Sequence, residues 1–301
     1  MPEAGPDAGQ VAVPPNPVED GQADERPPSA LGTVKTLAFI LAIQLFAIYI
    51  TRVNLPVIQA SGVTYSPAGN SSGGSITNVL ILVGFAFAAT LAGVWLARKR
   101  KVKLFTAVIY LSTGIALFFL TLLASINVTS GLEAYTSLYL SVAFASIAVL
   151  VLALVGLRRI PPWSALFLTG LLSAEVGSYF ASVIPIPTAL FLPIGFSLYD
   201  IYTVFKGPLR TLVTTLPDET LSAISSKIGD FSIGTGDTVF YSMIPALAYS
   251  QFGFGSAFLA ILAVDAGVAI TLYLLGRVRL LPGLPIPMFM GLAVLLVYYF
   301  H

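Results

Sequence analysis

Long apolar stretches, separated by short polar breaks, follow one another from residue 35 to the end of the chain. Each stretch is close to the roughly 20 residues that a helix needs to cross a hydrocarbon core of about 30 Å. The weakest boundary is the one between the fifth and sixth stretches, where only Pro185, Ile186 and Pro187 intervene. The pattern predicts nine spans, at about 35–51, 78–97, 104–126, 136–156, 161–181, 187–205, 229–249, 254–276 and 283–300. The expected fold is therefore an all-α polytopic membrane protein with nine transmembrane helices.

Residues 1–33 lack this periodicity and are rich in Pro, Ala and acidic residues. A segment of that composition buries too little apolar surface to fold. We expect a disordered N-terminal tail over 1–33 and a nine-helix membrane domain over 34–301. No basic segment followed by an apolar core opens the chain, so a cleaved signal peptide is not expected.

The composition supports a location in lipid. Hydrophobic residues make up 56% of the chain and charged residues only 10%, whereas about 25% charged residues is usual for soluble domains. The lipid bilayer is therefore the expected surrounding, and the protein is expected to be integral and multi-pass. The net charge of +1 leaves no excess positive charge to neutralise phosphates, so nucleic acid is excluded as a partner.

The basic residues predict the orientation. Of the 15 Lys and Arg residues, all but Arg52 fall in breaks on one side of the predicted bundle. Loops rich in Lys and Arg face the cytoplasm. We therefore expect a cytoplasmic N-terminus and a C-terminus outside.

The scarcity of Cys and His narrows the chemistry. The chain has no Cys and a single His, at position 301. A thiol nucleophile and a thiolate metal site are excluded, and a Ser–His dyad or a His-based zinc site is not expected. No metal and no cofactor are expected. If the chain hydrolyses a bond inside the membrane, carboxylates are the remaining acid–base groups.

Two carboxylates stand out, Asp200 in the sixth span and Asp237 in the seventh. An acid at bilayer depth is costly and marks a candidate functional site. Lys206 follows Asp200 by six residues, about 9 Å of helix, and Lys227 precedes Asp237 by ten, about 15 Å of helix. We therefore expect the two acids at comparable depth on antiparallel neighbouring helices. A pair sharing one proton can activate a water and polarise a carbonyl.

The neighbours of the two acids allow more than one interpretation. Gly234 and Gly236 flank Thr235 and leave space for water or a substrate backbone beside Asp237. Close helix packing is the alternative explanation for this glycine pair. Tyr199 is expected either to hydrogen-bond near the site or to fill a helix interface.

Three motifs resemble the presenilin family, in the order and on the spans expected for it. Residues 199–210 (YDIYTVFKGPLR) resemble its sixth helix, residues 234–242 (GTGDTVFYS) its GxGD helix, and residues 282–285 (PGLP) its Pro-Ala-Leu-Pro motif. The resemblance implies an intramembrane aspartyl protease of the GxGD class, a microbial presenilin homologue. It implies Asp200 and Asp237 as the catalytic pair. It also implies that Pro282, Gly283 and Leu284 shape the site and hold the unwound substrate. Together with Tyr199, Gly234, Thr235 and Gly236 they form the candidate residues that shape the site and bind substrate.

The resemblance also implies the partners. The substrates would be single-span membrane proteins, whose helix must unwind before attack and then pairs with a strand edge of the protease. Only 36 residues separate Asp200 from Asp237, without the long insertion of animal presenilins. We therefore expect a single uncleaved chain in the plasma membrane of a microbe, without obligatory accessory subunits. A homo-oligomer is left open.

A second function is kept open, that of a proton-coupled secondary transporter. Glu175 and Asp265 also lie within predicted spans and would form a proton path with Asp200 and Asp237. The simpler explanation is that each is hydrogen-bonded within the bundle. Asp230 precedes Asp237 by seven residues and is expected near the cytoplasmic surface, on the same helix face.

Overall fold

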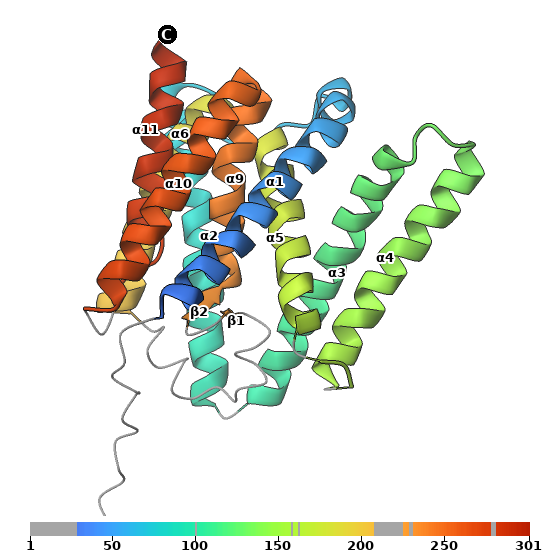
Figure 1. Ribbon diagram of the computed structural model, residues 1–301, viewed down its shortest axis with the longest axis horizontal. Helices are drawn as coiled ribbons and strands as arrows, with labels where there is room; N and C mark the ends of the chain where they lie inside the picture. The colour runs from blue at the N-terminus through green and yellow to red at the C-terminus, as the bar shows by residue number, and fades with distance from the viewer. Residues whose placement is uncertain are drawn as a thin grey trace, which may run out of the picture.

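The computed structural model describes residues 29–99, 101–157, 159–161, 163–207, 225–228, 231–277 and 281–301. Within these ranges the chain forms nine helices and one two-stranded hairpin (Figure 1). The helices are α1 (Ala30–Ser61), α2 (Ser72–Arg98), α3 (Val102–Val128), α4 (Ala134–Gly156), α5 (Trp163–Val183), α6 (Ile186–Phe205), α9 (Thr235–Phe252), α10 (Phe254–Leu275) and α11 (Pro285–Phe300). The strands are β1 (Ser225–Ile228) and β2 (Phe231–Gly234).

Local sequence signals account for several helix ends. The side chains of Ser29 and Ser71 cap α1 and α2 by accepting hydrogen bonds from the backbone N–H groups of Gly32 and Gly74. Pro185 precedes α6 and ends the break after α5, which confirms the division predicted there. The cap at Ser29 also corrects the predicted tail, because α1 begins at Ala30, inside the 1–33 segment. The rest of that tail, residues 1–28, lies outside the described residues.

The seventh predicted span begins later than expected. Residues 231–234 form β2, which pairs antiparallel with β1, and α9 begins only at Thr235. In β2 the side chains alternate, with Phe231 and Ile233 buried and Ser232 exposed, as a strand with one covered face requires. The predicted helical spacing from Lys227 to Asp237 is therefore wrong. Asp230 lies outside the described residues, and the strand after it breaks the helical register assumed for it.

Seven of the nine described helices are long and apolar enough to cross a membrane. α11, at 16 residues, is a shorter apolar helix, and α9 is not among the seven. α9 is the central helix, in contact with α1, α5, α10 and α11. Its residues from Phe240 to Ala248 are all buried. A helix enclosed by protein needs no lipid-facing apolar surface, which explains its lower hydropathy.

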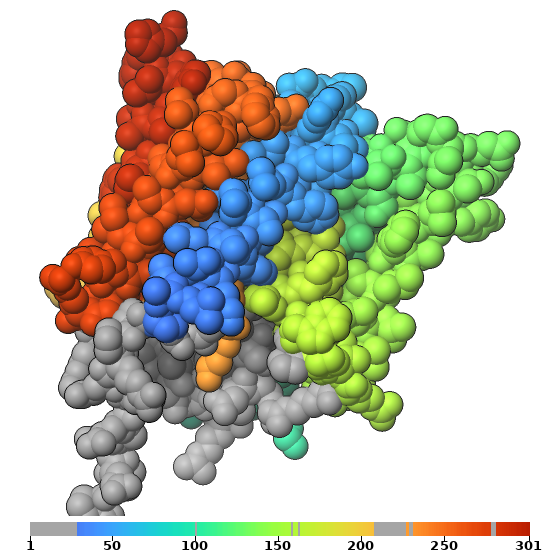
Figure 2. Space-filling model, viewed as in Figure 1, coloured from blue at the N-terminus to red at the C-terminus, as the bar shows by residue number. Residues whose placement is uncertain are grey.

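The other helices surround α9 in a consistent order. α1 lies between α10 and α5 on the face seen in Figure 2. α6 packs against α2 and α11, whereas α3 and α4 pair with each other at one edge of the bundle (Figure 1). The end of α6, the hairpin, the start of α9 and the start of α11 lie at the same end of the molecule (Figure 1). The three predicted motifs are thereby brought to one level.

Candidate active site

Asp200 and Asp237 are supplied by the last turns of α6 and the first turn of α9. Asp200 lies five residues before the end of α6, and Asp237 is the third residue of α9. Both side chains are partly exposed. A carboxylate in this position remains open to water while protein covers part of its surface.

The segment before α11 binds Asp200 directly. The backbone N–H of Leu284 donates a hydrogen bond of 2.9 Å to Oδ2 of Asp200. Leu284 itself is buried and lies at the N-terminal boundary of α11, so its N–H is one that the helix cannot use. A free backbone donor beside a carboxylate makes a charge-assisted hydrogen bond. Asp200 is therefore held in a defined position by the Pro-Gly-Leu segment.

The same segment adjoins Asp237. A methyl group placed on Gly283 would lie 3.0 Å from Oδ2 of Asp237 and 3.5 Å from the hydroxyl of Tyr241. The hydroxyl of Tyr241 donates a 2.9 Å hydrogen bond to the carbonyl oxygen of Gly283. Asp200 also exerts electrostatic repulsion on Asp237. The two acids therefore meet at consecutive residues, Gly283 and Leu284, with Pro282 buried beside them.

Tyr241 is the residue that sequence reasoning missed. It follows Asp237 by four residues, so the two side chains lie on one face of α9. That spacing was a usable signal, because a polar group one helical turn after an intramembrane acid can reach the same site. Tyr241 is only 4% exposed, and its hydroxyl fixes Gly283.

The glycines around Asp237 do not mediate close helix packing. Gly236 is exposed, with none of the described atoms within 4 Å of where a side chain would begin, and the nearest described atom to a methyl group on Gly234 is Oδ2 of Asp237, at 3.3 Å. Close packing occurs at other glycines, such as Gly177, where an added methyl would meet Ser242 and the backbone of α9. Of the two interpretations of Gly234 and Gly236, the geometry favours access to Asp237.

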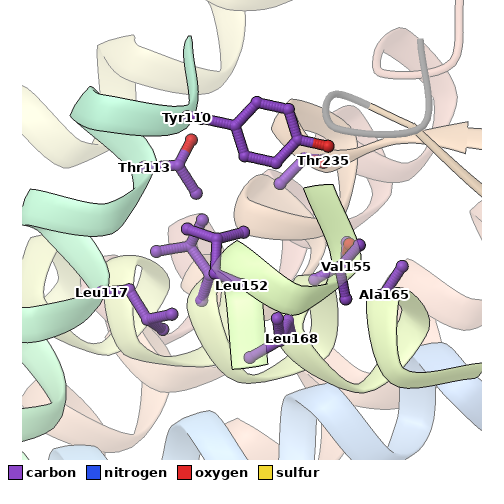
Figure 3. A pocket seen from close by; sticks show the side chains of 10 residues that line it. Tyr110, Thr113, Leu117, Leu152, Val155, Ala165, Leu168 and Thr235 are labelled. Atoms are coloured by element: carbon purple, nitrogen blue, oxygen red, sulfur yellow. The ribbon is translucent and has the colours of Figure 1, made fainter. Parts of the chain in front are cut away.

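Thr235 and Tyr199 face other parts of the molecule. Thr235 lines a small cavity of about 30 Å³ with Tyr110 and Thr113 of α3 and with residues of α4 and α5 (Figure 3). Among the described residues its buried hydroxyl has no hydrogen-bond partner. The hydroxyl of Tyr199 contacts Thr90 and the carbonyl oxygen of Ala86 on α2. Tyr199 therefore occupies a helix interface, which is the second of the two interpretations considered for it.

The other intramembrane acids lie apart from the pair. Glu175 is 3% exposed, accepts a 3.1 Å hydrogen bond from Thr121, and lines a largely apolar cavity of about 670 Å³ between α1, α3, α4 and α5. Asp265 of α10 accepts a 3.0 Å hydrogen bond from Nε2 of Gln44. Each acid has a neutral partner within the bundle. Within the described part of the chain, no group of three or more His, Asp or Glu side chains is placed to hold a metal ion.

The chain resembles known proteins in sequence and in fold. No protein-family model matches it. It is 28% identical over 281 residues to Presenilin-B of Dictyostelium discoideum, a match covering 81% of this chain and 56% of that protein. The chain thus spans about half the length of the curated relative that it matches.

Two solved structures of a presenilin family intramembrane aspartate protease share the fold. The structure in space group C222 has a TM-score of 0.59 at 20% identity and covers 87% of this chain and 98% of its own. The structure in space group P2 has a TM-score of 0.58 at 22% identity and covers 86% and 96%. The chain is therefore presenilin-like.

Proposed function

We propose that this presenilin-like chain is an intramembrane aspartic endopeptidase that hydrolyses peptide bonds within the transmembrane helices of its substrates. Asp200 and Asp237 form its catalytic pair. The observation that carries the proposal is the convergence of both acids on Gly283 and Leu284, through the hydrogen bond from Leu284 and the close approach of Asp237 to Gly283. The segment before α11 thus contacts both carboxylates, one through Leu284 and the other at Gly283.

The two acids take different roles. Asp200 carries the negative charge, because the Leu284 N–H stabilises its ionised form. Repulsion between the two groups is relieved when Asp237 holds the shared proton. Asp200 accepts a proton from a water, whose oxygen attacks the scissile carbonyl carbon while Asp237 donates its proton to the carbonyl oxygen. Asp200 then returns its proton to the leaving nitrogen as the C–N bond breaks, and Asp237 regains its own from the collapsing diol.

The hairpin supports binding of an unwound substrate. Two residues separate Ile228 from Phe231, and such two-residue loops join a hydrogen-bonded pair, so the next pair, Lys227 and Ser232, is a non-hydrogen-bonded one. The backbone N–H and C=O of Ser232 therefore point away from β1, toward the other edge of β2, where no described strand pairs. An extended substrate segment adds there as a third strand. Because β2 leads directly into α9, that segment passes beside Asp237.

The arrangement in the membrane follows the basic residues. We propose nine transmembrane helices, with α9 and α11 included, a cytoplasmic N-terminus and an outside C-terminus. The catalytic end of the bundle then faces the cytoplasm. The substrates are single-span membrane proteins, the location is the plasma membrane of a microbe, and no accessory subunit is required.

Cleavage of a purified single-span substrate by the purified protein tests the proposal. Asp200→Asn and Asp237→Asn each abolish cleavage, and the wild-type protein binds a transition-state analogue of aspartic proteases. Glu175→Gln is the matched control, because it removes an intramembrane carboxyl group outside the site while its side-chain oxygen still accepts a hydrogen bond from Thr121. Undiminished cleavage by either Asn variant overturns the assignment.

The same variants address the transporter hypothesis. A proton path needs a continuous series of proton-relaying groups between its acids. Glu175 accepts a hydrogen bond from Thr121 and Asp265 accepts one from Gln44, and neither bond joins these two acids to each other. No contact among the described residues joins Glu175 to the catalytic pair. Solute flux in vesicles that is lost in Glu175→Gln would favour transport over proteolysis.

A further inference from the structure

We propose that Gln44 of α1 is a positioning residue that aligns the active site through Tyr241 and Gly283. The inference rests on the proposed protease function. Gln44 is fully buried and lies in a run, 37–48, that is otherwise apolar. A buried amide costs stability unless its groups are hydrogen-bonded, so its presence there needs an explanation.

A proline inside α9 leaves one backbone carbonyl of that helix without its helical hydrogen bond. Pro245 has no backbone N–H, so the carbonyl oxygen of Tyr241, four residues earlier, loses its helical hydrogen bond. Nε2 of Gln44 lies 3.4 Å from that oxygen and donates to it. The amide therefore replaces, from another helix, the bond that Pro245 removes.

Asp265 fixes the amide in this orientation. Nε2 of Gln44 also donates a 3.0 Å hydrogen bond to Oδ1 of Asp265 on α10. Both neighbours of Nε2 are acceptors, so the NH₂ group and not the amide oxygen must face them. Oε1 of Gln44 is buried and has no partner within the described residues. The unpaired oxygen offsets part of the stability that the two donated hydrogen bonds supply, so stability alone does not account for Gln44, and a role in function is favoured.

The contact with Gln44 is transmitted to both catalytic acids. Gln44 holds the backbone of Tyr241, and the hydroxyl of Tyr241 holds the carbonyl oxygen of Gly283. Gly283 lies against Asp237, and the next residue donates to Asp200. Helices α10, α1 and α9 and the segment before α11 are thus linked by consecutive hydrogen bonds that end at the site. Reaction rates are sensitive to misplacements of about 1 Å at a catalytic centre.

A double-mutant cycle with Pro245 tests the proposal. Gln44→Met removes both donors at similar volume, and we expect kcat to fall about tenfold with KM within about twofold. Pro245→Ala restores the N–H that the Tyr241 carbonyl lacks. In that background Gln44→Met lowers kcat only about twofold. Equal losses in the two backgrounds overturn the proposal.

Two controls separate positioning from general stability. Thr51 is a fully buried polar residue on the same helix, two turns from Gln44, and bonds Ser178 of α5. We expect Thr51→Val to lower the melting temperature about as much as Gln44→Met does, but to leave kcat unchanged. Asp265→Leu removes the acceptor for Gln44 and lowers kcat. Asp265→Asn keeps an acceptor oxygen there and retains most of the wild-type kcat. If Gln44→Met does not fold, a Leu variant of Asp265 as active as the Asn variant overturns the proposal.

The failure of this inference and that of the protease function are distinguishable. If the wild-type protein cleaves no substrate, the proposed function fails. The contact between Gln44 and Tyr241 can then still be tested, because melting temperatures of Gln44→Met, Pro245→Ala and the double variant require no activity. Additive shifts in melting temperature show that the contact is absent, and non-additive shifts show that it exists.

Discussion

The backbone N–H of Leu284 lies 2.9 Å from Oδ2 of Asp200, although the two residues are 84 positions apart in the chain. The bond joins the start of α11 to the last turns of α6. The residue before Leu284 contacts the second acid, Asp237. The segment before α11 is therefore part of the site itself.

The size of residue 283 should control activity. A methyl group on Gly283 meets the Asp237 carboxylate at 3.0 Å, a contact that a shift of a few tenths of an ångström relieves. We expect Gly283→Ala to retain cleavage and Gly283→Val to lose at least about tenfold in kcat, because its branches would displace Asp237. Cleavage kinetics of both variants, with melting temperatures as a folding control, provide the measurement. A Val variant as active as the Ala variant would contradict the contact.

Removal of one hydroxyl should weaken the site. Tyr241→Phe loses only the hydrogen bond to the carbonyl oxygen of Gly283. We expect a loss of about 1 kcal/mol in the free energy of unfolding and a fall of about tenfold in kcat as Gly283 moves. Tyr199→Phe is the matched control, because its hydroxyl contacts α2 instead. Equal effects of the two variants on kcat would show that the Tyr241 bond has no special role.

The packing of α10 against α11 should tolerate no side chain at Gly267. A methyl group there would lie 2.5 Å from the Cα of Pro287 and 2.9 Å from its backbone nitrogen. Backbone atoms cannot rotate away, so Gly267→Ala should destabilise the protein by about 1–3 kcal/mol. It should also lower cleavage, because α11 carries Leu284 at its start. Gly84→Ala, on an exposed part of α2 with open space around it, should be neutral or slightly stabilising.

Cleavage of membrane-spanning substrates should require the edge of β2 that faces away from β1. Ser232→Pro removes the outward N–H, which pairs with no residue of β1, and an edge strand tolerates proline at such a position. We expect cleavage of a membrane-spanning substrate to fall about tenfold, while a small transition-state analogue binds as before. Ser232→Ala keeps the N–H and should behave as wild type. Equal losses of cleavage and of analogue binding would indicate damage to Asp237 rather than to substrate pairing.

The helices were predictable because lipid imposes a simple pattern. Apolar runs of about 20 residues have few alternatives to helix, and Pro185 ended one such run as expected. The start of α9 was not predictable in this way. The four residues of β2 alternate in burial, but a period of two over four positions is too short to distinguish from part of an apolar helix.

The acids of the proposed site could be selected from the sequence, whereas its supporting residues could not. The rarity of charge at bilayer depth marks Asp200 and Asp237 together with Glu175 and Asp265, and only the neighbouring motifs separate the first pair from the second. The direction of Tyr199 depends on where α2 packs, and the role of Gln44 depends on a carbonyl of α9 that is distant in sequence. Such contacts are set by the positions of whole helices relative to one another, which sequence periodicity does not specify.

The late start of α9 has an electrostatic consequence. The aligned peptide dipoles of a helix place partial positive charge at its first turn, on N–H groups that lack helical acceptors. Because α9 begins only two residues before Asp237, that positive end lies within the site. The exposed position of Gly236 leaves it uncovered. We therefore expect the partial positive charge at the start of α9, a helix largely enclosed by the other described helices, to stabilise negative charge that develops on a substrate oxygen as water attacks.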